Sequence, residues 1–532
     1  MDDLLIRGAE VIDGTGAPGR RIDVAVREGR ISAVGGLNRP ARRVIEAPGA
    51  VLAPGFIDIH THSDFTLPLN QRAESKIRQG VTTEVLGNCG FSVAPALEGR
   101  VELLRTYLAA SAPWLPFRAT TFEAYLDAFP ATSVNTVMQV GHNTLRLMTT
   151  GMESRAPRSD ELALMERLLD EALGAGALGL SSGLFTAPGS YAETEELLTL
   201  GRVLRRHGAG YASHVRNEAS RVFDAVDEAI SLGETCGIHV QIAHLKLSGT
   251  DNWGGASALL ARIDEARRRG VPVDADQYPY TTASNPLRNL LPLWVQEGGL
   301  DAMVKRLRDP AARDRIRRDI AAHGSGSFGR LPSWDAVRIA ISPNHAPSAG
   351  RTIGELARHR SADPLDAACD VLADDEGHTR VLLTSMSEED VQEILRAPTV
   401  LIGSDGTAVA PYGVTGQGKP HPRFYGTFVR VLGHYARDLG LLSLPAAIHK
   451  MTGGPAAALG LVERGLIREG YWADLALFDP RAVAEASTYD DPHRYAIGVA
   501  AVIVSGVMVV EDGTHTGALP GKVLRRGSRG VA

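Results

Sequence analysis

Cysteine is scarce in this chain of 532 residues. Its three cysteines, Cys89, Cys236 and Cys369, cannot all pair with one another, so they do not form a disulfide framework, and a reducing compartment is favoured. No stretch reaches the roughly 18 consecutive apolar residues that a membrane helix needs. The N-terminus is acidic and turns polar by Arg7, unlike a secretory signal. We expect a cytoplasmic protein that makes no membrane contact.

The chain also lacks a charge excess. Its formal net charge of -6 gives no polyanion-binding signature, so nucleic acid is not an expected partner. A hydrophobic content of 44% is enough for a large core. The length predicts two to four domains, or one elaborated barrel, and leaves a homo-oligomer open.

Both ends of the chain have the same β texture. Short alternating strands and Gly-containing turns fill residues 1–54, and similar segments recur over 461–532. Neither end alone is large enough to be stable as a sheet. We therefore predict one small β-sandwich formed from both ends, with residues 55–460 inserted between them.

The middle of the chain alternates strands and helices, which indicates a parallel α/β sheet. Helices are clearest at 159–173 and 221–236, where apolar residues recur at three- and four-residue spacing. Eight strands predict a (β/α)8 TIM-like barrel, with its active site at the carboxyl ends of the strands. The predicted strands are 56–60, 82–86, 135–140, 178–182, 210–214, 240–244, 271–276 and 399–404.

One interval interrupts the alternation. Residues 287–345 include a very basic helical pattern at 303–322. Because the interval leaves the carboxyl end of the seventh strand, we expect an insertion that covers the barrel mouth. The charges themselves favour a solvated helix surface over a partner-binding one, and whether the insertion moves as a lid is left open.

Residues able to bind a metal follow the ends of the predicted strands. Taken singly, Cys89 could be a small buried apolar residue, the histidines core residues, and Asp405 a turn residue. Six such residues at one end of a barrel instead favour a metal site, and a thiolate with imidazoles suits zinc. They are His60 and His62, on the same side of the first strand, Cys89 after the second, His214 and His244 at the ends of the fifth and sixth, and Asp405 after the eighth.

These residues belong to motifs by which the chain resembles the amidohydrolase superfamily and, within it, the N-acyl-D-amino-acid deacylases (D-aminoacylases). The resemblance spans nearly the whole chain, although the Gly-rich loop 407–420 departs from the pattern. Many members of the superfamily bridge two metals with a carboxylated Lys after strand four, and residues 179–183 contain none. The motifs are GFIDIHTHSD at 55–64, GVTT at 80–83, GNCG at 87–90, SHVRNE at 213–218, AHLK at 243–246, YPYT at 278–281, GSDG at 403–406 and HPR at 421–423.

The resemblance implies zinc-dependent hydrolysis of N-acyl-D-amino acids to a D-amino acid and a carboxylate. Zn2+ would be held tightly by Cys89, His214 and His244, with His60 and His62 completing a second, weaker site. Asp405 would be the general acid/base.

Two arguments identify candidate residues for binding the substrate's carboxylate: the position of Lys246 on its strand and the family resemblance. Lys246 lies two residues after His244 on the same strand face, so it points into the pocket. Tyr278, Ser284 and Arg423 match positions that hold the substrate carboxylate in the family. The side-chain pocket would include Asn285, Leu287 and Arg288, from which acidic or apolar preference cannot be predicted.

Two other functions stay open from the sequence. A cyclic amidase of the hydantoinase or dihydroorotase type would share the fold and the two adjacent histidines, but such enzymes normally use the bridging Lys. A non-catalytic barrel scaffold would be expected to have lost ligands, and all six are present.

Overall fold

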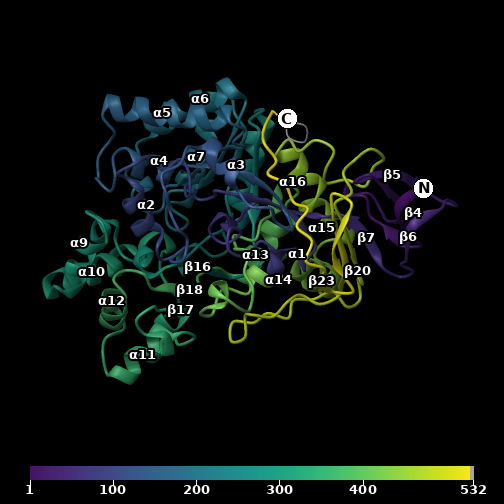
Figure 1. The fold of residues 1–532 in the computed structure, drawn as a ribbon. Coiled ribbons are helices and arrows are strands. Elements are labelled where there is room, and N and C mark those ends of the chain that lie inside the picture. Colours follow the sequence, from purple (N-terminus) through teal and green to yellow (C-terminus); the bar gives the residue numbers. More distant parts are fainter. Residues whose placement is uncertain (528–532) are drawn as a thin grey trace.

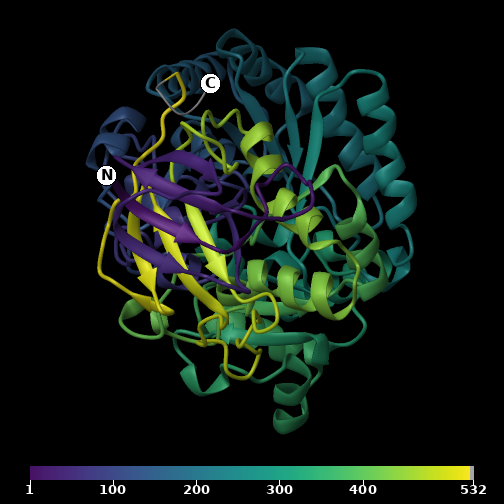
Figure 2. The same cartoon turned by 90° about the vertical axis from the view of Figure 1, so that its right-hand side faces the viewer.

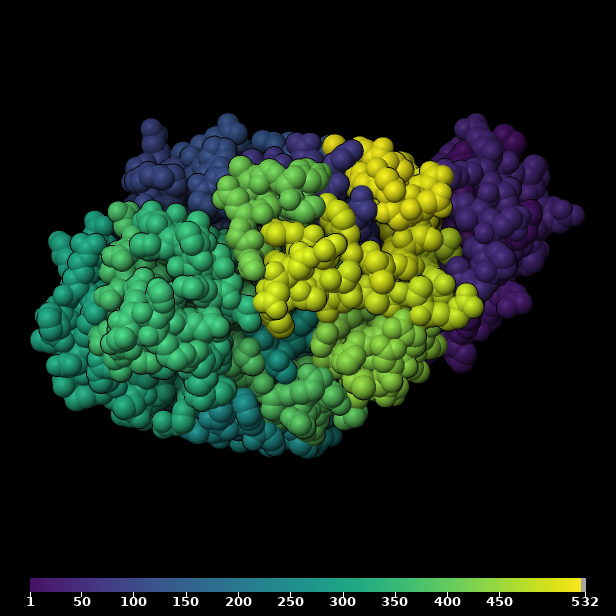
Figure 3. Space-filling model, turned by 90° about the horizontal axis from the view of Figure 1, so that it is seen from below, coloured from purple at the N-terminus to yellow at the C-terminus, as the bar shows by residue number. Residues whose placement is uncertain are grey.

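The computed structural model describes residues 1–527 as a barrel with a β-sandwich at one end and an inserted lobe at the other (Figure 1). Seen from below, the purple N-terminal strands and the teal-green insertion occupy opposite ends of the molecule (Figure 3). No helix in the described chain is both long and apolar enough to cross a membrane.

All eight predicted barrel strands have a counterpart in the structure. They pair in parallel, in the orders β10-β9-β8 and β11-β12-β13-β14-β15-β19, with β10 and β11 being consecutive parts of the third strand. A parallel bridge between Thr61 and Gly406 joins the first strand's end to the last's. The strands are β8 (Phe56–Asp58), β9 (Val81–Leu86), β10 (Asn135–Met138), β11 (Val140–Gly141), β12 (Gly179–Gly183), β13 (Gly210–His214), β14 (Val240–Ile242), β15 (Val273–Gln277) and β19 (Val400–Ile402).

Helices cover the outside of the barrel, with α5, α6 and α7 along one side (Figure 1). Their buried stripes, such as Leu168 and Leu169 on α5, join the main hydrophobic core. The barrel helices are α1 (Glu74–Ile77), α2 (Val101–Leu108), α3 (Phe122–Ala128), α4 (His142–Met148), α5 (Ser159–Gly174), α6 (Thr194–His207), α7 (Val222–Cys236), α8 (Ala256–Arg268), α13 (Glu388–Arg396), α14 (Arg423–Arg430), α15 (Leu444–Met451) and α16 (Gly453–Ala458).

The two chain ends form the sandwich together. Strand β20 pairs antiparallel with β7, so yellow C-terminal strands lie beside purple N-terminal ones (Figure 2). A separate apolar cluster, including Ile6, Val26 and Ile503, lies between the two sheets. One sheet contains β5 (Arg30–Gly35), β4 (Asp23–Arg27), β1 (Asp2–Arg7) and β6 (Ala41–Glu46); the other contains β23 (Thr514–His515), β22 (Val507–Glu511), β21 (Val499–Val504), β20 (Leu475–Phe478), β7 (Val51–Pro54), β2 (Glu10–Val11) and β3 (Arg20–Arg21).

The inserted lobe is longer than the interval 287–345. An antiparallel sheet in the order β16-β18-β17 draws together segments from 282 to 384 and has its own apolar core. The basic pattern 303–322 is two helices rather than one, because Pro310 begins the second and Asp309 caps it. The elements are β16 (Thr282–Pro286), β17 (Val337–Ile341), β18 (Arg380–Thr384), α9 (Leu300–Arg308), α10 (Pro310–His323), α11 (Ile353–Arg360) and α12 (Pro364–Asp374).

Ion pairs account for part of the basic charge. Arg313 and Arg317 on α10 pair with aspartates on and before α12. These contacts agree with a helix surface rather than a partner-binding face. The domain limits proposed from the sequence stay a prediction.

Candidate metal centre

Cys89, His214 and His244 converge at the carboxyl end of the barrel. Their donor atoms all lie within 4.8 Å of one another. All three residues are buried, and the Cys89 sulfur is 3.4 Å from Nε2 of His244. The ring nitrogens of His214 are buried and form no hydrogen bond among residues 1–527, although Nε2 lies 3.4 Å from the Glu218 carboxylate. A buried polar atom without a partner calls for a ligand, and a bound metal would provide one.

The protonation of these groups fits a metal as well. Burial alone would raise the pKa of the Cys89 thiol, but His60 and His244 hold that pKa well below its ordinary value. Burial lowers the pKa of His214, so its imidazole is neutral at pH 7. Burial and Lys246 would lower the pKa of His244, but the Cys89 thiolate and Glu218 raise it above its ordinary value, so a metal bound there would replace a proton on that ring. A thiolate with two deprotonated imidazoles is a set of ligands that zinc prefers.

Three site residues adopt a backbone conformation that L-residues rarely take. Cys89, His244 and Asp405 have φ of 53°, 36° and 47°. Such conformations cost free energy and persist where the surrounding fold enforces them, often at functional sites. They also explain why β14 ends at Ile242, before the predicted limit of 244.

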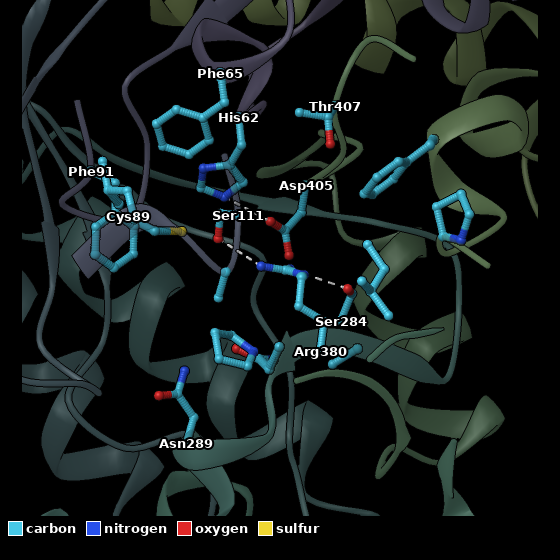
Figure 4. Close-up of a pocket in the computed structure, with 18 of the residues that line it drawn as sticks. His62, Phe65, Cys89, Phe91, Ser111, Ser284, Asn289, Arg380, Asp405 and Thr407 are labelled. Atoms are coloured by element: carbon cyan, nitrogen blue, oxygen red, sulfur yellow. Dashed lines mark hydrogen bonds and ion pairs between the residues drawn. The ribbon is translucent and has the colours of Figure 1, made fainter. Parts of the chain in front are cut away.

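A second group of donors contains His60, His62, Cys89 and Asp405. Nε2 of His62 is 3.1 Å from the Asp405 carboxylate, and the two side chains lie next to each other in the pocket (Figure 4). Nε2 of His60 is 3.2 Å from the Cys89 sulfur. The structure therefore brings all six sequence-predicted residues together, and it adds Asp405 to the donors expected around His60 and His62.

Two carboxylates orient the histidines, and neither was assigned a role from the sequence. Asp276 on β15 lies 3.1 Å from Nδ1 of His60, and Glu218 lies 3.1 Å from Nδ1 of His244. A carboxylate on the second nitrogen fixes the ring's orientation and leaves the other nitrogen for a metal. Both had a sequence signal: Glu218 ends the SHVRNE motif, and Asp276 ends a predicted strand.

Lys246 lines the pocket, but the strand argument that placed it there was wrong. The chain is not extended at His244, whose φ is positive. The Lys246 ammonium is paired with buried Glu218 and lies 2.6 Å from Nδ1 of His244. Its charge is therefore already balanced by a carboxylate.

Tyr278, Ser284 and Arg423 also line the pocket. The Arg423 guanidinium donates to Asp405 over 2.9 Å and lies 4.5 Å from the centre of the Tyr278 ring. The Tyr278 hydroxyl is buried without a partner in the described chain. Ser284 accepts a hydrogen bond from Arg380, a pocket residue that sequence reasoning missed.

Of the three residues predicted for the side-chain pocket, two lie in its lining and one does not. Asn285 and Arg288 line the pocket, whereas Leu287 packs in the core of the insertion. Another part of the lining is aromatic and comes from the segment after β9, which contributes Phe91, Tyr107 and Trp114. No motif pointed to this part, because scattered aromatic residues have many structural uses.

The fold and this donor set match known proteins. The family model described as amidohydrolase family matches residues 43–510. The chain belongs to the amidohydrolase family. A D-aminoacylase from Alcaligenes xylosoxydans xylosoxydans is 37% identical over 98% of both chains. An N-acyl-D-glutamate deacylase and an N-acyl-D-aspartate deacylase of the same organism are 36% and 38% identical, over 98% and 99% of this chain and 96% and 95% of theirs. The resemblance to D-aminoacylases is confirmed.

Solved structures support the same assignment. A D-aminoacylase with a binuclear metal centre aligns with a TM-score of 0.83 and 36% identity, over 99% of this chain and 100% of that one. A Bordetella bronchiseptica N-acyl-D-glutamate deacylase, complexed with zinc and a phosphonate inhibitor, has a TM-score of 0.83 and 35% identity over the same shares. The predicted fold class is confirmed. A D-hydantoinase at 15% identity and a TM-score of 0.56 shares the fold alone.

Proposed function

We propose that this amidohydrolase is a zinc-dependent N-acyl-D-amino-acid deacylase. It would hydrolyse the amide of an N-acyl-D-amino acid to a D-amino acid and a carboxylate. The observation that carries the proposal is the convergence of Cys89, His214 and His244 beside Asp405 in a pocket rich in cationic groups.

The metal-binding residues divide into two groups that share Cys89. Cys89, His214 and His244 would hold the tighter zinc, because they combine a thiolate with two buried imidazoles. His60 and His62, with Asp405 beside them, would hold a second, weaker metal. Zinc bound to Cys89, His214 and His244 would supply a nucleophilic water near neutral pH and would polarise the substrate's carbonyl group.

Asp405 is the proposed general acid and base. Burial alone would raise its pKa, but the charge of Arg423 and a hydrogen bond from His62 hold the pKa well below its ordinary value. Asp405 is therefore ionised at neutral pH. Its carboxylate can accept the proton of the attacking water and then deliver it to the nitrogen of the leaving amine.

The substrate's α-carboxylate is assigned to Arg423, Tyr278, Lys246 and Ser284. Nε and Nη1 of Arg423 are buried and have no hydrogen-bond partner among residues 1–527. The hydroxyl of Tyr278 is likewise buried and without a partner in that range. These donors are available to an anionic group, for which hydrogen bonds from a guanidinium are strong. The preference for the D-enantiomer rests on the relatives that act on N-acyl-D-amino acids.

A chiral substrate screen with metal analysis on the same sample tests the proposal. N-acetyl-D- and N-acetyl-L-amino acids are compared with a cyclic hydantoin. We expect hydrolysis of the D-series, poor hydrolysis of the L-series and the hydantoin, and about one tightly held zinc per chain. Equal D and L rates would remove the deacylase assignment. Preferred hydrolysis of the hydantoin would favour a cyclic amidase, and no turnover by zinc-loaded protein would favour a scaffold.

A further inference from the structure

Arg380 lies in the pocket and has no carboxylate partner among the described residues 1–527. It begins strand β18 of the insertion, and its guanidinium donates to Ser111 Oγ over 2.7 Å and to Ser284 Oγ over 3.4 Å. Figure 4 shows it reaching between these two serines, just beyond Asp405. Both serines are neutral, so neither balances the charge of the guanidinium.

The other cations of the pocket differ in this respect. Lys246 is paired with Glu218, and Arg423 is paired with Asp405. The remaining cation, Arg288, is buried, donates to the main-chain carbonyl oxygens of Gly377 and Tyr107, lies over the Tyr107 ring, and forms no salt bridge with a carboxylate among residues 1–527. Apart from the proposed metal ligands Cys89 and the histidines, the described pocket lining thus holds four lysine and arginine side chains, Lys246, Arg288, Arg380 and Arg423, against two carboxylates, Glu218 and Asp405.

An unbalanced charge in such a place is costly unless something pairs with it. Burial, together with the nearby charges of Arg423 and Arg288, lowers the pKa of Arg380 to about 10. Arg380 stays protonated at neutral pH and repels its two guanidinium neighbours. A carboxylate that entered between them would relieve this repulsion.

We propose that Arg380 binds a carboxylate on the substrate's side chain, so that the enzyme prefers N-acyl derivatives of acidic D-amino acids. The inference rests on the proposed function, in which Arg423 binds the α-carboxylate. Arg380 and Arg288, the two pocket guanidiniums that pair with no carboxylate of the described chain, would then face the second carboxylate of a dicarboxylic substrate. The planar fork of an arginine suits a carboxylate, and the hydroxyls of Ser111 and Ser284 hold the Arg380 fork in place.

The first test compares acidic substrates with neutral ones of the same shape. For the wild-type enzyme, kcat/KM is measured on N-acetyl-D-glutamate and N-acetyl-D-glutamine, and on the D-aspartate and D-asparagine pair. We expect the acidic member of at least one pair to be preferred by roughly 10- to 100-fold, the value of a charge-assisted hydrogen bond.

The second test assigns the preference to Arg380. Arg380→Met should remove most of the acidic preference. It should lower kcat/KM on N-acetyl-D-glutamine much less, because the neutral substrate loses only the support that Arg380 gives Ser284 and Ser111, whereas the acidic substrate also loses the charged contact. Arg380→Lys should retain part of the preference. Arg318→Met, which removes an exposed arginine of α10, is the matched control and should change neither substrate. Zinc content and thermal unfolding are measured on each variant.

Three results would overturn the inference. The wild type could favour neutral or apolar side chains, which decides the matter even if the variant does not fold. Arg380→Met could slow acidic and neutral substrates equally, which would place Arg380 on the α-carboxylate or in a structural role. Arg380→Met could keep the full acidic preference. If instead no N-acyl-D-amino acid is hydrolysed, the proposed function itself fails.

Discussion

Replacing Glu218 with Gln should weaken both metal binding and folding, for two separable reasons. The Glu218 carboxylate is buried between the Lys246 ammonium, Nδ1 of His244 at 3.1 Å and Nε2 of His214 at 3.4 Å. Burial by itself would raise its pKa, but the charge of Lys246 and the two histidines lower that pKa well below the ordinary value. Glu218 is therefore a carboxylate at every pH where the enzyme is expected to work.

The magnitudes follow from these contacts. Losing a carboxylate behind a metal-binding histidine typically weakens metal affinity by about 10- to 100-fold, or roughly 1.4–2.7 kcal/mol. Breaking a buried ion pair costs up to about 3–5 kcal/mol, but the Gln carbonyl still accepts from Lys246. We therefore expect Glu218→Gln to lower the unfolding free energy of the metal-free protein by about 2–3 kcal/mol.

Two measurements separate the effects. Metal affinity is measured by competition with a chromophoric chelator, and stability by denaturant unfolding of the metal-free protein. Adding Lys246→Met to Glu218→Gln should recover stability, because the uncompensated ammonium is gone, while metal affinity stays low. Glu171→Gln, at an exposed position of α5, is the control for charge removal. Unchanged metal affinity in Glu218→Gln would refute the orienting role, leaving Glu218 only as the counter-ion of Lys246.

Four further predictions concern the site and one helix cap. Asp405→Asn should reduce turnover by about 10²–10⁴-fold while the tight zinc remains bound, and wild-type turnover by the zinc-loaded variant would exclude Asp405 as the acid/base. Lys246→Met and Arg423→Met should each lower kcat/KM on free acids far more than on the matching carboxamides, whereas unchanged efficiency in both variants would remove the proposed clamp. Removing metal with a chelator should abolish hydrolysis and zinc should restore it, an expectation that full activity of a metal-free sample would contradict. Arg155 lowers the pKa of Glu161 to about 2. The stability that this carboxylate adds is therefore present above about pH 4.5 and is lost as the pH falls through about 2. Glu161→Gln should lower the unfolding free energy at pH 7 and change it little at pH 2, as measured by urea unfolding.

The barrel and its donor residues could be predicted because their signals are local. Each strand is a short apolar run, and His214 or Asp405 follows such a run directly. Parallel strands bring their carboxyl ends to one edge, so residues far apart in the chain could be placed together without a structure. The sandwich was predictable for a similar reason, since both ends share one strand texture.

The insertion sheet and the orienting carboxylates depend on contacts that no local pattern encodes. Strands β16, β17 and β18 are short. β17 pairs with β18 across about 40 residues and β16 pairs with β18 across about 90, so the predicted interval ended at 345, well before Arg380. The sequence shows that Asp276 and Glu218 are acidic residues near predicted strand ends, but it does not show which side chains they contact. Their partners depend on how β15 and the loop after β13 approach the histidines.

The division between barrel and insertion has a consequence for how such a site can change. Most of the proposed metal ligands lie on or just after barrel strands, and Asp276 and Glu218 support them from the same scaffold. Ser284 and Arg380 instead belong to the insertion, whose apolar core is separate from that of the barrel. A substitution in the insertion can therefore alter the charge facing the substrate's side chain without moving the metal ligands. Arg380→Met should accordingly leave zinc affinity unchanged and alter only the choice between substrates, whereas Glu218→Gln should reduce zinc affinity and with it the hydrolysis of every substrate.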